Sequence, residues 1–269
     1  MDELLFVKLG GSLITRKSAA SAARPRVIRR LAHEIRGALD EAPGLRLVLG
    51  HGSGSFGHVV AHRYAVQSGC HDWLGYALTS AAAARLNRIV VDAFLEEGVP
   101  VVALQPSASA RCREGKLVDL AWQPVAELLQ HQLVPLVYGD VALDEVWGST
   151  IISTETIFAC LAHQLQPTRV LLVGEVCGVY TADPHLDTRA RLITYIAAGR
   201  QMPESVDIAG SNAVDVTGGM HSKVDIMAAL VRELPGLLVQ FLSGSRPGLL
   251  RRSLLDRELN PGTRLTGRQ

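Results

Sequence analysis

Short apolar runs alternate with longer segments of helical spacing along this chain of 269 residues. A short apolar run bounded by turn residues is typical of a buried strand, and apolar residues three and four apart are typical of an amphipathic helix. The pattern predicts strands at 4–9, 45–49, 99–104, 133–138, 170–173 and 238–242. It predicts helices at 27–39, 77–97, 156–164 and 220–234, and a hairpin over 141–152 with Asp144 and Glu145 near its turn.

This alternation predicts an α/β fold, a three-layer αβα sandwich with a mostly parallel central sheet. A boundary near Gln166 and Pro167 divides the chain into an N-terminal acceptor-binding lobe, 1–165, and a C-terminal nucleotide-binding lobe, 166–269, on one continuous sheet. Ligands of such sheets bind at the carboxyl ends of the strands. Glycine clusters follow the strands there, or precede helices, so they mark the predicted site.

Composition narrows the class of protein. The hydrophobic share of 48% is enough for a large core, and the net charge of +1 argues against a nucleic-acid partner. No window approaches the roughly 20 apolar residues of a membrane span, and the start of the chain is acidic, so we expect no membrane association and a cytoplasmic location. The four cysteines lack paired or zinc spacing, which predicts free thiols in a reducing compartment: Cys70, Cys112, Cys160 and Cys177. Four arginines are predicted to form a solvated helix face: Arg24, Arg26, Arg29 and Arg30.

Two glycine-rich motifs follow the first two predicted strands. The first runs from Lys8 to Ser12, and its two glycines would let backbone N–H groups approach an anion beside the lysine charge. The second runs from His51 to His58 and contains G-x-G-x-x-G, which also opens dinucleotide-binding folds. That interpretation requires an acidic residue at the end of the next strand, but Asp72 lies in no predicted strand. An anion-binding loop fits better, although plain turns and a structural histidine remain open.

Two further motifs lie in the second half. The segment from Asp215 to Lys223 opens a helix with Thr-Gly-Gly, so the helix N-terminus and Lys223 could bind one phosphate, or the segment could be an ordinary capped helix. In the segment 178–184, Tyr180 could pack on a base and Asp183 could bond a ribose or cap a turn. Walker A, nucleophile-elbow and zinc-hydrolase patterns are absent from the sequence. Lysines beside glycine turns instead favour phosphoryl transfer, which depends on positioning and charge neutralisation.

Taken together, these motifs and the segment 138–141 resemble the amino acid kinase superfamily in order and spacing, from residue 4 to about residue 245. Two subgroups resemble the chain most. Isopentenyl phosphate kinases share the loop ending Ser55-Phe56-Gly57-His58 and a second lysine like Lys17, and fosfomycin-resistance kinases have a helix motif similar to 218–223. The histidine after the loop suits an acceptor that is itself a phosphate or phosphonate.

The resemblance implies roles for the matching positions. The catalytic residues would be Lys8, Lys17, His58, Lys223 and Glu155. ATP would be bound by Lys8, Gly10, Gly11, Ser12, Gly54, Glu175, Tyr180, Asp183, Gly218, Gly219 and Lys223. The acceptor would be bound by Ser53, Gly54, His58, Gly139 and Ser153. No metal ligands are expected from the protein, because Mg²⁺ would be held mainly by the ATP phosphates.

Two positions depart from the family pattern. The family usually has Ser-Gly-Asp where this chain has Ser153-Thr154-Glu155, and Glu155 keeps the charge but is one methylene longer. The family usually has Thr-Asp-Val-Asp-Gly where this chain has 174–178, so that Glu175 keeps one acidic position and Cys177 replaces the other. The change at Glu155 affects the expected positions of the active-site lysines, and the change at Cys177 affects the expected contacts to the nucleoside.

Three functions follow. The first is ATP-dependent phosphorylation of isopentenyl phosphate to isopentenyl diphosphate, with an apolar slot for the tail near Trp73 to Phe94. The second is phosphorylation of fosfomycin or another small phosphonate, which Arg85 and Arg88 could serve. The third is a catalytically silent nucleotide-binding regulator, against which the retention of the lysines and His58 argues. The resemblance also implies a homodimer.

Overall fold

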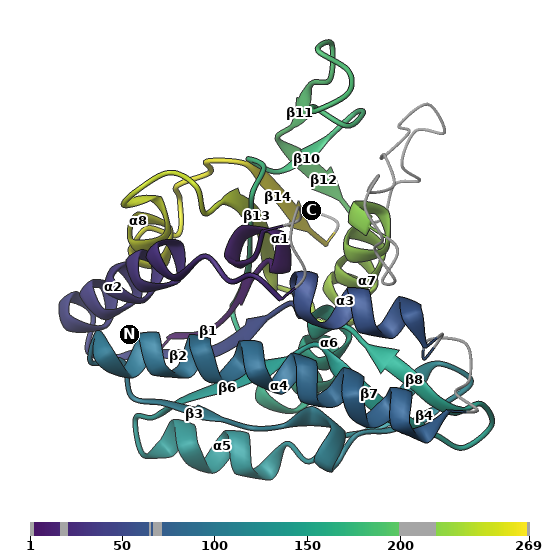
Figure 1. Cartoon of the computed structure of the whole chain (residues 1–269). Helices are drawn as coiled ribbons and strands as arrows, with labels where there is room; N and C mark the ends of the chain where they lie inside the picture. The colour runs from purple at the N-terminus through teal and green to yellow at the C-terminus, as the bar shows by residue number, and fades with distance from the viewer. Residues whose placement is uncertain (1–2, 17–20, 65, 67–71, 199–218, 268–269) are drawn as a thin grey trace.

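The computed structural model describes residues 3–16, 21–64, 66, 72–198 and 219–267, and for residue 58 it describes the backbone only (Figure 1). Its centre is an eight-stranded sheet. The strands, in spatial order, are β12 (Tyr195–Ala197), β14 (Thr263–Thr266), β13 (Leu238–Ser243), β9 (Arg169–Gly174), β1 (Glu3–Leu9), β2 (Leu45–His51), β6 (Val134–Tyr138) and β3 (Val101–Ala103). From β13 to β3 every neighbouring pair is parallel, and β14 is antiparallel to β13.

Helices cover both faces of this sheet. They are α1 (Gly11–Ile14), α2 (Pro25–Glu41), α3 (Gly54–Arg63), α4 (Trp73–Glu96), α5 (Gln123–Gln130), α6 (Thr154–Leu165), α7 (Gly219–Glu233) and α8 (Leu249–Leu255), with a 3₁₀ turn η2 at Pro106–Ala108. A second sheet contains β5 (Lys116–Asp119), β4 (Arg111–Arg113), β7 (Asp140–Asp144) and β8 (Gly148–Ile152). A small hairpin pairs β10 (Val179–Tyr180) with β11 (Leu192–Ile193) and projects from the body (Figure 1).

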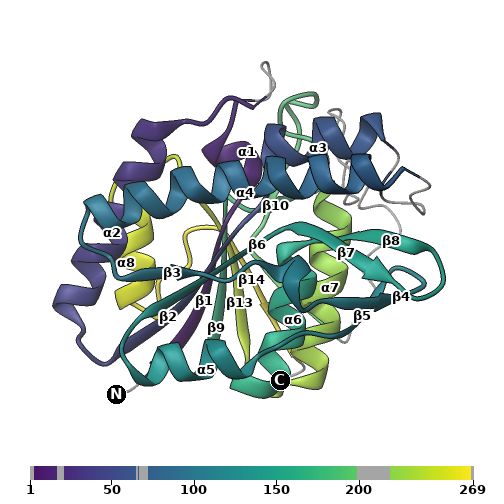
Figure 2. The same cartoon turned by 60° about the horizontal axis from the view of Figure 1, so that its bottom comes forward.

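The alternation of side chains along β1 builds two cores. Leu5, Val7 and Leu9 pack with apolar residues of α2, α4 and α8, and Leu4 and Phe6 pack on the other face with residues of α5, α6 and α7. Because side chains alternate along a strand, Lys8 shares the second face with Leu4 and Phe6. Figure 2 shows the sheet between these helix layers. The predicted three-layer αβα sandwich with a mostly parallel sheet is therefore confirmed.

The predicted strands and helices are present, with ends shifted by a few residues at most places. The glycine-rich segment after the second predicted strand is the main exception, because a loop was expected there. The structure instead continues β2 to His51 and starts α3 at Gly54. The glycines there serve close packing: a Cβ on Gly50 would lie 2.5 Å from Thr154 Cγ2, and a Cβ on Gly57 would lie 2.5 Å from Ser53 Oγ. The division into lobes at residue 165 stays a prediction.

Asp144 fixes the turn between β7 and β8. Its Oδ1 accepts hydrogen bonds from the backbone N–H groups of Val146 and Trp147 at 2.9 and 2.8 Å and of Glu114 at 3.1 Å, and its Oδ2 accepts one from Gly115 at 2.8 Å. Burial alone would raise the pKa of this carboxyl, but the four N–H donors lower it below its usual value.

Replacing Asp144 with alanine would leave these donors without their acceptor. We expect the free energy of unfolding to fall by about 2–3 kcal/mol, measured by urea denaturation. The exposed Asp119 of the neighbouring strand β5 offers a control, and Asp119→Ala is expected to stay within about 0.5 kcal/mol of the parent. Equal stability of the two variants would show that Asp144 does not hold the turn.

Candidate functional site

The loops after four parallel strands meet at one edge of the sheet. Gly10, after β1, donates its N–H to the carbonyl of Val173 in β9 at 2.8 Å. Gly52, after β2, donates to the carbonyl of Leu9 at 3.0 Å, and Gly139, after β6, donates to the carbonyl of His51 at 3.1 Å. These bonds hold the glycine motifs at the carboxyl edge, where parallel α/β sheets bind ligands.

The first two glycine motifs cross in direct contact. A Cβ on Gly11 would lie 2.6 Å from the backbone nitrogen of Gly54, and a Cβ on Gly52 would lie 2.9 Å from the nitrogen of Gly11. Thr15 connects the two motifs, because its Oγ1 donates a hydrogen bond to the carbonyl of Gly11 at 2.7 Å and accepts one from the N–H of Ser55 at 3.1 Å. Only residues without a side chain allow the backbones to approach this closely.

Gly54 is the most constrained residue of this crossing. Its φ is +49°, and a Cβ there would collide with Thr15 Oγ1 and lie 2.8 Å from the carbonyl oxygen of Gly11. We expect Gly54→Ala to lower the free energy of unfolding by roughly 3 kcal/mol, from backbone strain together with overpacking. Gly248→Ala is the matched control, because its φ is +76° and no atom lies within 4 Å of its Cβ position. Equal losses of stability in urea denaturation would show that the crossing is not tightly packed.

Lys8, Glu155 and Lys223 come together beside the crossing. Lys8 at the end of β1 forms an ion pair with Glu155 in the first turn of α6, and the two residues are only 7% and 1% exposed. Burial alone would raise the pKa of Glu155, but the charges of Lys8 and Lys223 and the hydrogen bond from Lys8 lower it. Glu155 is therefore ionised at neutral pH, where it pairs directly with Lys8 of β1 and attracts the charge of Lys223 of α7.

The start of α6 is fixed by its own side chains. Ser153 caps the helix, because its Oγ accepts from the N–H of Thr156 at 3.0 Å. Thr154 donates its hydroxyl to the carbonyl of His51 at 2.7 Å, which ties α6 to the end of β2. Ser153 was expected to bind the acceptor, and the structure gives its hydroxyl a role in the cap.

His51 supports several parts of the site at once, a role that the sequence analysis did not assign. Its ring is fully buried and stacks on Tyr138, with centroids 5.5 Å apart. Nδ1 lies 3.1 Å from the carbonyl oxygen of Gly52 and Nε2 lies 3.2 Å from the side-chain oxygen Oδ1 of Asn87. Burial lowers the pKa of His51 to about 4, so the ring is neutral at pH 7 and donates its single N–H to one of these two oxygens. The His51 ring thus contacts the glycine loop at Gly52, α4 at Asn87 and β6 at Tyr138.

A small cavity lies between α3, α4 and the start of β7. It is lined by two predicted acceptor-binding residues, Ser53 and Gly139, and by Thr79, Ala83 and Asp140. Asp140 is buried and accepts hydrogen bonds from the N–H groups of Ser107 at 3.2 Å and Val141 at 2.9 Å. Burial raises the pKa of this carboxyl above its usual value. Of the region expected to form a tail slot, Thr79 and Ala83 face the cavity, whereas Leu74 and Leu78 are exposed to solvent.

The residues predicted to bind the nucleoside lie after β9. Glu175 forms an ion pair with Arg24 at 3.2 Å, and its carbonyl accepts from the hydroxyl of Ser243 at 3.2 Å. Arg24 precedes α2, and together with Arg30, which donates to the carbonyl of Gly244, it reaches inward. The prediction of a fully solvated arginine face was therefore wrong for these two residues, because carbonyl and carboxylate acceptors lie within their reach.

Tyr180 lies in β10, and Asp183 lies in the loop that connects β10 to β11. The phenol of Tyr180 has a raised pKa because of burial and the neighbouring Cys177. Asp183 accepts from the N–H of His185 at 2.9 Å and thus closes a turn. The turn interpretation of the Asp183-Pro184 segment is confirmed, and nucleoside binding by these residues stays a prediction.

The remaining predicted site residues lie in three helices or outside the described residues. Ser12 lies in α1, and Gly219 starts α7, the helix that carries Lys223. Residue 58 lies in α3, next to the glycine crossing, and Lys17 and Gly218 lie outside the described residues. Within the described ranges, no group of three or more His, Cys, Asp or Glu residues could hold a metal ion.

A comparison with protein families matches residues 3–239 to the model of the amino acid kinase family. The chain belongs to the amino acid kinase family. An isopentenyl phosphate kinase of Methanothermobacter thermautotrophicus is 36% identical over 98% of this chain and 100% of its own. The resemblance predicted from the glycine motifs is thus confirmed.

Solved structures of the family agree with this assignment. An isopentenyl phosphate kinase superposes with a TM-score of 0.84 at 33% identity and covers 98% of this chain and 100% of its own. The product complex of the Thermoplasma acidophilum enzyme superposes with a TM-score of 0.78 at 25% identity, over 97% of this chain and 99% of its own. The shared fold of this kinase family therefore extends over nearly the whole chain.

Proposed function

We propose that this kinase transfers the γ-phosphate of ATP onto isopentenyl phosphate and releases isopentenyl diphosphate and ADP. The observation that carries the proposal is the convergence of Lys8 and Lys223 on the buried Glu155, beside the crossed glycine turns. Two oriented cations next to closely packed backbone make a site for phosphate groups. The full-length relatives named above are isopentenyl phosphate kinases, which favours this acceptor over a phosphonate.

The chemistry follows from charge and position. Lys8 and Lys223 neutralise the β- and γ-phosphates of ATP, and Lys17 neutralises the group in transfer. His58, Ser53 and the N-terminal N–H groups of α3 hold the acceptor phosphate near Gly54. A phosphate monoester is already an anion at neutral pH, so its oxygen attacks without a strong general base. Glu155 acts by keeping the lysines in place.

Magnesium belongs to this proposal as a companion of ATP. Glu155 is the acidic side chain beside the lysines, and Lys8 already neutralises it. This arrangement fits an ion held by the nucleotide phosphates, and such an ion would neutralise part of their charge.

Cys112, Cys160 and Cys177 are free thiols, which supports a cytoplasmic location. In the part of the chain that is described, no helix is long and apolar enough to cross a membrane.

The acceptor's apolar tail and the oligomeric state are further parts of the proposal. The cavity lined by Ser53, Thr79 and Ala83 lies next to the proposed phosphate position, but its volume of about 10 Å³ is too small for the tail, so α3 and α4 would have to move apart to admit the first carbons. Trp73, Leu74 and Leu78 of α4 are exposed apolar side chains beside it. A homodimer, as implied by the family resemblance, would cover them.

The proposal is tested by an ADP-release assay with ATP and Mg²⁺, run in parallel with isopentenyl phosphate, dimethylallyl phosphate and fosfomycin. We expect turnover with isopentenyl phosphate and little with fosfomycin. Turnover with fosfomycin alone would assign the chain to the phosphonate kinases, and turnover with none of the three would favour a silent regulator.

The role of His58 has its own test. We expect His58→Ala to lower kcat/KM for isopentenyl phosphate by about 10- to 100-fold, because a hydrogen bond to a charged group contributes about 1.5–3 kcal/mol. The KM for ATP should change little. His62→Ala, on the same helix and exposed, is the control and should behave as the parent. An equal loss of ATP affinity in the His58 variant would contradict the assignment to the acceptor.

A further inference from the structure

A second cavity lies at the opposite edge of the sheet from the glycine motifs. It has a volume of about 710 Å³ and lies where β13 begins, at Leu238, and where β14 ends, at Thr266. Small-molecule sites in proteins commonly have volumes of 300–1,000 Å³. The kinase chemistry proposed above uses the other edge, so this cavity has no part in it.

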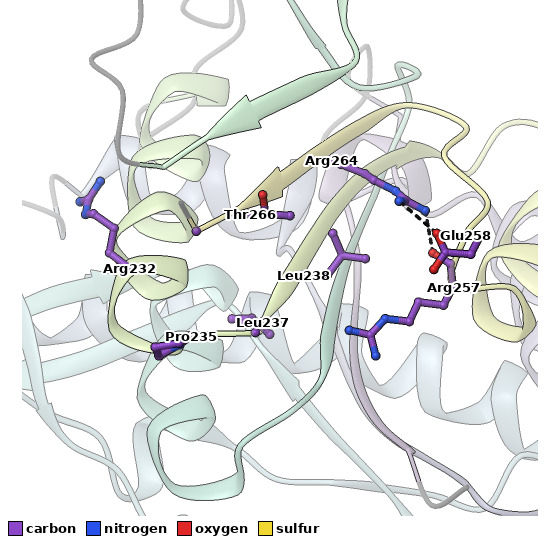
Figure 3. A pocket seen from close by; sticks show the side chains of 10 residues that line it. Arg232, Pro235, Leu237, Leu238, Arg257, Glu258, Arg264 and Thr266 are labelled. Carbon is purple, nitrogen blue, oxygen red and sulfur yellow. Dashed lines mark hydrogen bonds and ion pairs between the residues drawn. The ribbon is translucent and has the colours of Figure 1, made fainter. Parts of the chain in front are cut away.

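Arginines dominate the charge of this cavity. Figure 3 shows Arg257 and Arg264 on one side of Leu238 and Arg232 on the other. Glu258 is the acidic residue of the lining, and its side chain is 86% exposed and 3.7 Å from a guanidinium nitrogen of Arg264. A contact of this length at an exposed carboxylate neutralises little of the arginine charge. Counted over the described residues of its lining, the cavity therefore has an excess of positive charge.

Arg264 also has donor capacity that the fold does not use. Its Nη2 donates to the carbonyl of Arg257 at 2.7 Å, which fixes the guanidinium in place. Its Nε is buried and has no hydrogen-bond partner among the described residues. A buried N–H without an acceptor is unfavourable, so the fold holds this arginine at a cost.

Among the described residues, no carboxylate forms an ion pair with Arg257 either. The positive charge of Arg257 acts on the nearby carboxylate of Glu3 and contributes to lowering its pKa. Burial would raise the pKa of Glu3, but the hydrogen bond and charge of Arg169, together with Arg257, lower it. Arg169 binds both oxygens of Glu3, at 2.9 and 3.0 Å, and so satisfies that carboxylate. Arg257 is left available to an anion from solution.

We propose that this cavity, which we call the arginine cavity, binds the diphosphate group of a small anionic ligand. Neighbouring guanidiniums favour phosphate groups because each presents two parallel N–H donors, and two of them match two linked phosphates. If the proposed kinase reaction is correct, its product carries such a group, and the cavity is then a site for product feedback.

Helix α7 connects this cavity to the phosphate site. Lys223 lies in its first turns, and Arg232 lies in its last turn and donates to the carbonyl of Ala198 at 2.9 Å. The two residues are nine positions apart, which corresponds to about 14 Å along the helix axis. Pro235 and Leu237, just after the end of α7, also line the cavity, so a ligand there lies against the end of the helix that carries an active-site lysine.

The test is calorimetric titration of the whole protein with inorganic pyrophosphate, which needs no acceptor and so stands apart from the kinase assay. To remove binding at the phosphate site, the titration uses the Lys223→Ala variant as background. In this background we expect one binding event, weakened at least 10-fold by the additional change Arg257→Gln. Arg252→Gln, an exposed arginine of α8 outside the cavity, is the matched control and should leave the event unchanged.

Arg257 is exposed, so its replacement should leave the fold intact, and an unchanged Tm would confirm this. Absence of binding in the Lys223→Ala background, or equal binding by the Arg257→Gln and Arg252→Gln variants, would overturn the proposal.

Discussion

Glu155→Gln should lower kcat about 100-fold and destabilise the protein by about 3 kcal/mol. The amide keeps the shape of the side chain but removes the charge that Lys8 and Lys223 share. Loss of one partner of a buried ion pair costs about 3–5 kcal/mol, because the remaining charge has no compensation. Displacing a catalytic group by about 1 Å can cost 100-fold in rate. Single-turnover kinetics and urea denaturation measure the two effects.

Glu155→Asp is the matched control for this experiment. Aspartate keeps the charge and is the residue that the family usually has here, so most of the activity and stability should remain. If the glutamine variant retained the parent's kcat, the two lysines would not depend on Glu155 for their positions.

The shifted pKa values of Glu155 and His51 predict how the stability of the fold depends on pH. The pKa of Glu155 is lowered in the folded state, so its contribution is complete above the unfolded pKa of about 4.3 and is lost as pH falls through the folded value. His51 acts in a different window: its folded pKa of about 4 is below the unfolded value of about 6.5, so stability decreases as pH falls between the two. In Glu155→Gln, the loss between pH 6.5 and 4 should persist, and the part due to Glu155 below about 4.3 should disappear.

Lys223→Ala should lower kcat/KM for ATP by about 100- to 1,000-fold, the usual cost of removing one group that stabilises the transition state. Lys223 is only partly buried, so its removal should change the Tm by no more than a few degrees. Steady-state kinetics with varied ATP give the measurement. Arg232→Ala, at the other end of the same helix, serves as the control and should leave kcat/KM within about 2-fold in the absence of added diphosphate.

An equal loss of activity in Lys223→Ala and Arg232→Ala would mean that the substitutions had disturbed α7 as a whole, and that the charge of Lys223 was not the cause. A parent-like kcat/KM in Lys223→Ala would remove this lysine from the phosphate site.

The sequence predicted the parts of the fold that depend on periodicity. The apolar run at 4–9 predicted β1, and the alternation of its side chains explains why Lys8 faces α6 and meets Glu155. Short elements such as α5, α8 and β14 were missed, because eight or fewer residues carry too little of a pattern to stand apart from loops.

Within the site, the sequence located the glycine motifs but not the contacts between them. Nothing in the local pattern shows that Gly11 touches Gly54, that His51 is neutral and holds Gly52, or that Arg24 reaches Glu175. Each of these contacts joins residues brought together by the tertiary fold or depends on burial, which a single sequence does not display.

We expect the protein to transfer a phosphoryl group directly from ATP to isopentenyl phosphate. The most direct measurement is ³¹P NMR of the reaction of the purified protein with ATP, Mg²⁺ and isopentenyl phosphate. Our account predicts that the monophosphate signal of isopentenyl phosphate is replaced by the paired signals of a diphosphate, in step with the formation of ADP. ADP formed together with inorganic phosphate, while the isopentenyl phosphate signal stays unchanged, would contradict it.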